Sequence, residues 1–444
     1  MFVIIAFSNI HLMIEAISAD NKEMVSPRRI VVTGMGMISP LGLDVKTSWQ
    51  RLIAGETGIV PIDLPFVKNI KVAGEIGKKF DPNILLEGFV LPKDLRRIST
   101  PARFALAAAI EACREARLLD GKKLKDEIDP NKAGVGIGTG IGGGYNISEI
   151  SERIKRGEEC SPFDILNLLP DRIASVVAIK LGLKGPLAMP AAACATGNLA
   201  IAFGYDMIKR KADIMIVGGA EATIEHVGLN SFDGAKALSR ETDPRKASRP
   251  FDKNRTGFVM SEGASVMVLE EREHALRRGA KILAEMVGYG NTSDAFHDTA
   301  PNGEGAERAM EEAIEQMGGL PESGLTYVHA HGTGTPMNDK TEIPVIKRVV
   351  YDRHKLKEVA VSSTKGATGH MIGAAGSTGA VFSVKAIVEG VLPPTINLEE
   401  PMDEAVGMDL VPNVARKAQP VIAINNSFGF GGFNIVTIFK KSEG

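Results

Sequence analysis

The sequence predicts an α/β protein built by internal duplication. Short apolar runs rich in β-branched residues, typical of buried strands, alternate with runs of small residues that predict helices. A small-residue helix followed by a pair of apolar strands occurs twice, with the helices at 195–212 and 373–390. No linker rich in proline, serine or charge separates the two halves. We therefore expect the halves to share one interface, with an active site between them.

The first half is expected to span residues 28–279. Its first strand, 28–39, is short, β-branched and stopped by "PLG", and the alanine-rich segment 101–119 predicts a helix. The elements that follow are strand 133–140, strand 185–194 running into helix 195–212, and strands 213–219 and 263–271 separated by a long insertion.

The second half, 280–444, repeats this order. The amino-acid similarity between the halves is weak, and the similarity in the order of their elements is moderate. Its elements are strands 281–290, 325–335 and 358–364, then helix 373–390, and finally strand 420–428, a glycine-rich turn and strand 433–441.

Bulk composition limits the classes of partner. With 444 residues, of which 44% are hydrophobic and 24% charged, the chain is long enough to bury a catalytic cavity. A net charge of -2 gives no overall positive field for nucleic acid or an anionic membrane, so neither is expected as a partner. The cysteines, at 113, 160 and 194, form no CxxC pair and are odd in number. This favours a reducing, cytoplasmic compartment.

Residues 1–27 are expected to be an N-terminal extension outside the fold. The segment is apolar, but it contains Asn9, His11 and Glu15 and has no basic region at its start. It is therefore a poor signal peptide and is too interrupted to span a bilayer. Met24 lies just before the first strand and is a candidate start, which would make residues 1–23 dispensable.

Cys194 lies in "AAACATGN" (191–198), among small residues at the junction of a predicted strand and helix. Free cysteines are most often buried packing residues. A helix start, however, offers unpaired N–H groups and a dipole that stabilise a thiolate. The small neighbours would also let a substrate carbonyl approach closely. Both interpretations, packing residue and nucleophile, stay open from this segment alone.

His329 and His331, in "HAHGTGTPMNDKTE", are two residues apart at the end of a predicted strand, so both are expected on the same face. This spacing would allow metal binding, but no carboxylate or third histidine stands at a ligand spacing such as HExxH. A pair of buried structural histidines is the other alternative. The residues expected to orient an imidazole from outside are Thr333, Thr335, Asp339 and Glu342.

Two further segments carry candidate functional groups. Lys365 and His370 lie in a glycine-rich loop that opens the helix 373–390, which suggests a close approach of backbone to ligand rather than ordinary surface. "NNSFGFGG" (425–432) is a turn that either joins a hairpin or lends backbone N–H groups to an oxyanion. Its glycines lack the spacing of the nucleotide-binding loops.

Taken together, these segments resemble the β-ketoacyl-acyl-carrier-protein synthases of fatty acid synthesis, in particular the type II enzymes. The motifs are "ACATG", "AHGTGTPxxDxxE", "STKxxTGHxxGAAG" and "NSFGFGG", and the resemblance runs from Arg28 to Lys441. It implies the thiolase fold, an internally duplicated five-layered α/β/α/β/α arrangement, and a homodimer. It also implies an acyltransferase that elongates a fatty acyl chain by two carbons, with malonyl and acyl thioesters of acyl carrier protein as partners.

The resemblance implies a role for each matched residue. Cys194 would be the nucleophile that accepts an acyl chain, and the N–H groups of Cys194 and Phe430 would form the oxyanion hole. His331 and His370 would donate hydrogen bonds to the enolate oxygen formed when the malonyl group loses CO₂. Lys365 would supply positive potential and hold His370 and its loop.

Within the same resemblance, Glu342 would anchor the lysine network, and no step would require a metal or another cofactor. Phe430 would act as a gate to an acyl pocket formed by Ile141, Phe232 and Phe428. The chain departs from the family pattern at Phe433, Ala192 and Asn338. These departures leave acyl-chain length undetermined.

The implied carrier is acidic and must therefore dock on a local basic patch. "LPKDLRR" offers Lys93, Arg96 and Arg97, and Lys236 matches another basic docking position of the family. Glu158 and Glu159 stand where the family's bacterial members often carry basic residues. They would narrow the patch and favour a less acidic or dedicated carrier.

Several alternatives share parts of this pattern. A non-catalytic chain-length factor would lack the nucleophile, and a degradative thiolase would carry a second cysteine near the C-terminus, whereas none follows Cys194 here. A metal-binding or scaffolding protein would depend on His329 and His331. A specialised paralogue with unusual acyl chains or a dedicated carrier, and a polyketide-type ketosynthase, remain compatible with the motifs.

Overall fold

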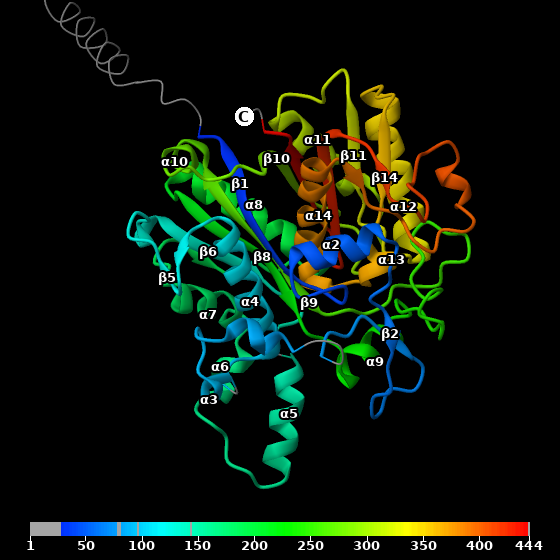
Figure 1. Ribbon diagram of the computed structural model, residues 1–444. Coiled ribbons are helices and arrows are strands. Elements are labelled where there is room, and N and C mark those ends of the chain that lie inside the picture. The colour runs from blue at the N-terminus through cyan, green and yellow to red at the C-terminus, as the bar shows by residue number, and fades with distance from the viewer. Residues whose placement is uncertain (1–27, 78–80, 96, 143, 443–444) are drawn as a thin grey trace, which may run out of the picture.

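The computed structural model describes residues 28–442 except 78–80, 96 and 143 (Figure 1). The N-terminal extension predicted for residues 1–27 lies outside the described residues. Ten strands of the described chain form one mixed sheet. From edge to edge they are β12 (Val359–Ser362), β11 (Leu325–His329), β15 (Pro420–Gly429), β16 (Phe433–Lys440), β10 (Ala284–Ser293), β1 (Ile30–Ile38), β9 (Gly263–Glu271), β8 (Ile214–Glu221), β6 (Ala133–Gly138) and β7 (Leu187–Ala188).

The strand order confirms the predicted duplication. In one half of the sheet, β10 pairs antiparallel with β16, β16 antiparallel with β15, and β15 parallel with β11, which pairs parallel with β12. The other half repeats this pattern in the order β1, β9, β8, β6 and β7. The two halves meet where β1 pairs antiparallel with β10, with Ile30 opposite Met286.

Helices complete five layers, as the fold class predicts. In Figure 1, α4 (Thr100–Glu115) and α7 (Arg172–Leu181) cover one side, and α11 (Glu304–Gln316) and α12 (Pro336–Ile346) cover the opposite side. Between them, α8 (Thr196–Arg210) packs against α14 (Ala375–Glu389). The strands therefore bury both faces, because each half of the sheet lies between an outer and a central helical layer.

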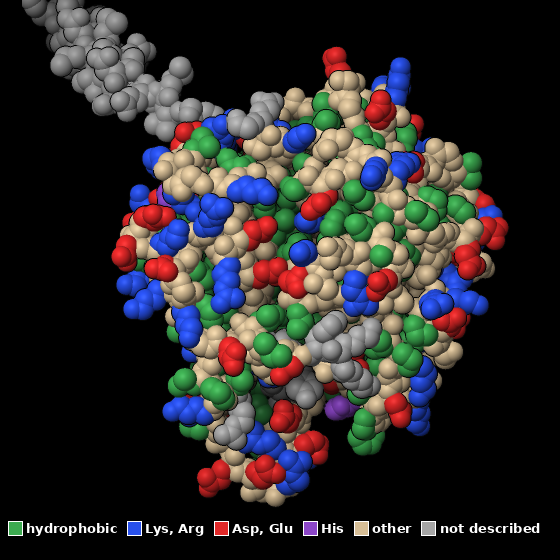
Figure 2. Space-filling model, in the orientation of Figure 1, with side chains coloured by type: hydrophobic (Ala, Val, Ile, Leu, Met, Phe, Trp, Pro, Cys, Tyr) green, Lys and Arg blue, Asp and Glu red, His purple; other side chains and the backbone are tan. Residues whose placement is uncertain are grey.

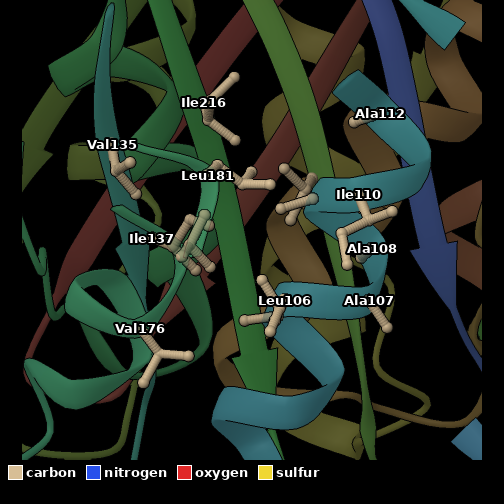
Figure 3. Packing of buried hydrophobic residues seen from close by; sticks show 14 of the residues in the cluster. Leu106, Ala107, Ala108, Ile110, Ala112, Val135, Ile137, Val176, Leu181 and Ile216 are labelled. Atoms are coloured by element: carbon tan, nitrogen blue, oxygen red, sulfur yellow. The ribbon is translucent and has the colours of Figure 1, made fainter. Parts of the chain in front are cut away.

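The alternation of side chains along β8 shows how one strand serves two cores. Ile214 and Ile216 belong to the outer core beneath α4 and α7. Met215 and Val217 point to the opposite face and belong to the central core around α8 and α14. Figure 3 shows the outer core, in which Leu106 and Ile110 of α4 belong to the same buried cluster as Ile216 of β8 and residues of β6 and α7.

The two central helices begin unusually close together. A Cβ placed on Gly197 of α8 would lie 2.4 Å from the backbone nitrogen of Ser377 in α14. One placed on Gly376 would lie 2.8 Å from the nitrogen of Asn198. Only glycine allows this approach, and it brings the N-terminal turns of α8 and α14 together, with Cys194 and His370 just upstream.

One predicted strand is much shorter than expected. The segment 185–194 forms only β7, Leu187–Ala188, because Pro186 and Pro190 cannot donate hydrogen bonds to a ladder. The chain then passes directly into the turn that carries Cys194. No helix among the described residues is long and apolar enough to cross a membrane.

The other described elements are shorter or lie at the periphery. Their bounds are α2 (Val45–Ile53), β2 (Val60–Pro61), β3 (Val72–Ala73), η1 (Pro82–Leu86), α3 (Pro92–Leu95), β4 (Leu119–Asp120), β5 (Lys123–Leu124), η2 (Pro130–Lys132), α5 (Gly144–Lys155), α6 (Asp164–Leu168), η3 (Ala193–Ala195), α9 (His226–Gly234), α10 (Arg272–Arg277), η4 (Lys347–Arg353), α13 (Lys365–Thr368), η5 (Ile372–Ala374), β13 (Val391–Leu392), η6 (Asp403–Ala405) and β14 (Arg416–Lys417).

Candidate active site

A pocket forms where the starts of the two central helices meet the turn between β15 and β16. It is lined by both polar and aromatic side chains from the two halves of the chain. Those that matter for chemistry are Cys194, His331, His370, Thr333, Thr335, Phe428, Phe430 and Lys236. The structure thus collects most of the residues that the motifs singled out, although they are far apart in sequence.

Cys194 is held in a tight turn rather than at the end of a strand. It lies in η3, directly before α8, and Ala193 beside it has a positive φ of 47°. The hydroxyl of Ser427 donates to the carbonyl oxygen of Cys194 over 3.0 Å. A Cβ on Gly429 would lie 3.3 Å from the Cys194 nitrogen. The turn that contains Phe430 therefore packs directly against the backbone of the cysteine.

The protonation state of Cys194 differs from the sequence expectation. Burial raises the pKa of the thiol to about 12, and the nearby charge of Lys365 offsets only part of this effect. The helix start was expected to favour a thiolate, but the cost of desolvating a buried anion is larger. Cys194 is therefore a thiol at neutral pH, so an attack by its sulfur would require loss of that proton.

His331 and His370 face each other across the pocket, with ring centroids 5.5 Å apart and planes at 82°. Burial lowers the pKa of both imidazoles well below the usual value, and the charge of Lys365 lowers it further. Both rings are therefore neutral. The Nδ1 atom of His370 accepts from the N–H of Ile372 over 3.2 Å, so its proton resides on Nε2, which is free to donate.

Lys365 and Glu342 hold the backbone of His331 from opposite sides. The Lys365 ammonium donates to the carbonyl oxygen of His331. The Glu342 carboxylate accepts from the N–H groups of His331 and Gly332, each over 2.7 Å. Lys365 was expected to hydrogen-bond to His370 and its loop. The structure instead places its ammonium against the backbone of His331, beyond the end of the neighbouring strand β11.

The residues expected to orient an imidazole instead organise the loop after His331. Thr333 and Thr335 hydroxyls lie 2.9 Å apart, and Thr335 caps α12 by accepting from Asn338. Asp339 accepts from the backbone N–H groups of Phe251 and Gly334. These contacts fix the backbone of the loop, and the hydrogen bonds described for them do not include an imidazole ring.

Aromatic rings continue from the histidines toward the pocket mouth. Phe258 packs edge-on against His370 at 5.0 Å, and Phe232 lies 5.5 Å from Phe258 and 6.3 Å from Phe430. Phe428 is buried beside His331, whereas Phe430 is 37% exposed. Phe428 therefore forms a fixed part of the pocket wall, and Phe430 is the more accessible of the two rings.

Two of the three residues of the predicted acyl pocket do not line the pocket around Cys194. Phe428 lines it, whereas Phe232 only contacts Phe258 and Phe430 of its wall, and Ile141 is 40% exposed. The neighbouring Gly140 packs against Ile372 and donates its N–H to the carboxylate of Glu221.

His329 and His331 are not equivalent, although a strand would place them on the same face. β11 ends at His329, so His331 lies in the following loop and turns into the pocket. His329 stays under the site, with Nε2 3.1 Å from the Thr364 hydroxyl. Within the described part of the chain, no three His, Cys, Asp or Glu side chains are grouped so that they could hold a metal ion.

Three positioning residues were not predicted from the motifs. Ser427 holds the Cys194 turn, and Asn338 donates to both Asp339 and Glu342. Glu221, at the end of β8, accepts from the N–H groups of Gly140 and Gly373 and so links the two halves next to the site. Ser427 and Asn338 lie inside quoted motifs, but only spatial contacts reveal what they bind.

The described residues among those predicted for carrier docking lie in two hollows. Lys93 and Arg97 line a groove beside α5 and α6, where Arg97 pairs with Asp94 and stacks on Phe163. Lys236 instead lies at the mouth of the Cys194 pocket. Arg96 lies outside the described residues. On the face of the molecule that Figure 2 shows, basic and acidic side chains are mixed.

If the pocket performs the malonyl decarboxylation that the motifs imply, the pKa shifts predict an unusual pH profile for it. The depressed pKa values keep both imidazoles neutral as the pH falls through 6.5, so the rate should stay flat from about pH 7.5 down to about pH 5.5. Burial lowers the pKa of Lys365 to about 8, so its charge, and with it the rate, should be lost above that pH. CO₂ release measured at graded pH checks both limbs.

The matched control for this profile is Lys365→Met, which should be slower at every pH and should lack the alkaline limb. An acid limb centred near the ordinary histidine pKa of about 6.5 would contradict the assignment of neutral imidazoles.

A duplicated five-layered fold with a buried cysteine thiol and two neutral imidazoles at one pocket defines the class of thiolase-fold proteins. Comparison with known proteins agrees with this class. Residues 27–275 match the model of the beta-ketoacyl synthase N-terminal domain, and residues 283–399 match that of the C-terminal domain. The chain belongs to the beta-ketoacyl synthase family, whose members are acyltransferase-type condensing enzymes.

Similar proteins of known name and structure cover nearly the whole chain. The 3-oxoacyl-[acyl-carrier-protein] synthase 2 of Vibrio cholerae is 44% identical over 94% of this chain and 100% of its own length. The protein of the same name from Staphylococcus aureus is 41% identical over 95% of this chain and 100% of its own. A beta-ketoacyl synthase from Burkholderia phymatum superposes with a TM-score of 0.84 at 30% identity, covering 94% and 100% of the two chains.

A ketosynthase of polyketide type is also similar in structure. It was solved with its type II acyl carrier protein and bound hexaketide, and it superposes with a TM-score of 0.84 at 28% identity, covering 94% of this chain and 100% of its own.

Proposed function

We propose that this protein elongates fatty acyl chains by decarboxylative condensation of an acyl-enzyme with malonyl-acyl carrier protein. The observation that carries the proposal is the shared pocket of Cys194, His331 and His370, in which both imidazoles are neutral. In this proposal, residues 28–279 contribute the nucleophile and residues 280–444 contribute the two histidines.

The first half-reaction transfers the acyl group. The Cys194 sulfur attacks the carbonyl carbon of the acyl thioester, and the carrier thiolate leaves and takes up the proton given up by the Cys194 thiol. The backbone N–H groups of Cys194 and Phe430 stabilise the tetrahedral oxyanion, with each good donor worth about 3 to 4 kcal/mol. The products are acyl-Cys194 and the free carrier thiol.

The second half-reaction forms the new carbon–carbon bond. Malonyl carrier protein loses CO₂, and the electron pair passes to the thioester as an enolate, whose oxygen accepts from His331 and His370. The enolate carbon attacks the acyl-Cys194 carbonyl, and collapse of the tetrahedral intermediate expels the Cys194 thiolate, which is then reprotonated. The product is a β-ketoacyl carrier protein two carbons longer, and these steps as written use no metal or nucleotide.

The test is reconstitution of the purified enzyme with malonyl carrier protein and acyl primers of graded length. Mass spectrometry should detect β-ketoacyl products with one added two-carbon unit per turnover. Products extended repeatedly without reduction would instead place the enzyme with polyketide ketosynthases, as the similar hexaketide-bound structure would suggest. If neither condensation nor malonyl decarboxylation occurs, the proposal is wrong.

We also propose that the enzyme is a cytoplasmic homodimer. Support comes from α5, which projects from the body in Figure 1 and exposes Ile147 and Ile154, and from the adjoining α6, which exposes Ile165, at 54 to 59%. Large apolar side chains gathered on one exposed region are typical of an interface. A second copy would cover them, and light scattering should give twice the mass of one chain.

Charge reversal tests the proposed docking of the acidic carrier. Lys93→Glu with Arg97→Glu should raise KM for malonyl carrier protein about tenfold or more and flatten its salt dependence, because rim charges act mainly through encounter and screening. Turnover of malonyl-coenzyme A should barely change. Steady-state kinetics at two salt concentrations with both substrates make the measurement.

Lys123→Glu with Lys184→Glu is a matched control, because it reverses the same charge at exposed lysines of a different groove. An equal loss on both substrates in the Lys93 and Arg97 variant would mean that these residues support the fold. No loss on either substrate would place the carrier elsewhere.

A further inference from the structure

His329 is a buried histidine that the proposed reaction leaves unused. It ends β11, is 2% exposed and lies outside the pocket around Cys194. Its Nε2 is 3.1 Å from the hydroxyl oxygen of Thr364, the residue directly before Lys365. Its Nδ1 is buried and makes no hydrogen bond of good geometry among the described residues, and a weaker hydrogen-bond contact links the ring to the Asn425 side chain. A buried polar nitrogen of this kind requires a partner, because leaving it unpaired is costly.

The side chain of Asn425 supplies the nearest candidate. Asn425 is the in-register neighbour of His329 across the parallel pair of β11 and β15. A Cβ placed on Gly379 would lie 2.3 Å from the Asn425 Oδ1 and 2.7 Å from the His329 Nδ1, so both atoms face the same bare turn of α14. The Asn425 Oδ1 is likewise buried and makes no hydrogen bond of good geometry within the described part of the chain. The two neighbouring groups can satisfy each other only if the histidine donates.

The orientation of the Asn425 side-chain amide follows from its hydrogen bond with Asn198. The Nδ2 of Asn198 donates to the carbonyl oxygens of Asn425 and Ile435, each over 3.0 Å, and this fixes which end of its amide is nitrogen. Its Oδ1 must then accept from the Nδ2 of Asn425, over 2.8 Å. The oxygen of the Asn425 amide is therefore the end turned toward His329.

We propose that His329 is a positioning residue held as the neutral Nδ1–H tautomer, with Nδ1 donating to Asn425 and Nε2 accepting from the Thr364 hydroxyl. The chain of contacts runs from Asn198, one turn after Cys194, through Asn425 and His329 to Thr364. It thereby ties the segment that carries Lys365 and His370 to the start of α8.

Thr364 affects the site because it starts the helix α13, which carries Lys365. Its carbonyl oxygen accepts the first backbone bonds of α13, from the N–H groups of Ala367 and Thr368, each over 3.0 Å. Lys365 follows directly, and its ammonium reaches the carbonyl oxygen of His331. Fixing the Thr364 side chain therefore fixes the starting point of Lys365. The catalytic part of this inference rests on the proposed function, whereas the tautomer does not.

The direct test is the tautomer of His329 in the unmodified enzyme. Long-range ¹H–¹⁵N NMR of protein labelled at its eight histidines should show one buried ring with a protonated Nδ1 and an unprotonated Nε2 from pH 5.5 to 8. The signal is assigned by its loss in His329→Gln. A protonated Nε2, or a ring that titrates in this range, would overturn the proposal whatever the enzyme's activity.

Variants test the functional part. Glutamine can present an oxygen near the position of Nε2, so His329→Gln should keep malonyl decarboxylation close to wild type, whereas His329→Asn, which cannot reach Thr364, should lose about tenfold in kcat. Thr364→Val removes the hydroxyl that donates to His329 and should lower kcat by the same factor. The double variant, His329→Asn with Thr364→Val, should lower kcat no further. Acylation of Cys194 should be unchanged in all of them. Equal losses in both half-reactions, or additive losses, would leave His329 with a packing role only.

Discussion

Replacing Cys194 by alanine is expected to abolish condensation and acyl transfer while the fold stays intact. In the proposed reaction the nucleophile is the Cys194 thiol, which lies in the turn packed against Gly429, and its removal leaves the substrate carbonyl without an atom to attack it. The change deletes one buried atom at a site where the backbone is held by Ser427, so the packing should survive. Mass spectrometry of the protein incubated with acyl carrier thioester should show no acyl adduct.

Cys194→Gln provides the sharper comparison. Its carboxamide can occupy the oxyanion hole as an acyl thioester would, so this variant should release CO₂ from malonyl carrier protein without forming a β-ketoacyl product. Circular dichroism and thermal unfolding show whether both variants are folded. Accumulation of β-ketoacyl product by either variant would mean that the nucleophile lies elsewhere.

Much of the fold was predictable because periodicity reports burial directly. The alternation of strands and helices and the repeated order of the halves are both found, and β8 buries alternate residues on two faces as its apolar run suggests. The wrong prediction for 185–194 also has a physical cause. The apolar run predicted a strand, but two prolines leave only Leu187–Ala188 in the strand ladder.

The site was predictable as a set of residues but not as a set of contacts. Motif matching placed Cys194, His331 and His370 at one pocket. It could not reveal that Lys365 bonds to the backbone of His331, because the two are brought together only by the pairing of β11 with β12. Nor could motif matching show whether burial or the helix start has the larger effect on the pKa of Cys194. The effect of burial depends on every atom packed around the sulfur.

The two histidines should be needed for decarboxylation but not for acylation of Cys194. An enolate oxygen has two lone pairs, and in a buried pocket the neutral imidazoles of His331 and His370 are the donors that can serve them. His331→Ala and His370→Ala should each lower malonyl decarboxylation by about 10² to 10³, the effect of losing one preorganised donor.

Stopped-flow release of CO₂ measures the decarboxylation step, and trapping of acyl-Cys194 measures the step before it. His329→Gln is the matched control, because it also changes a buried histidine of the same strand end but one outside the pocket. If His331→Ala and His370→Ala decarboxylate at the full rate, the enolate is stabilised by other groups. If they fail to become acylated, the imidazoles act in the first half-reaction, most directly by taking the thiol proton that burial makes hard to remove.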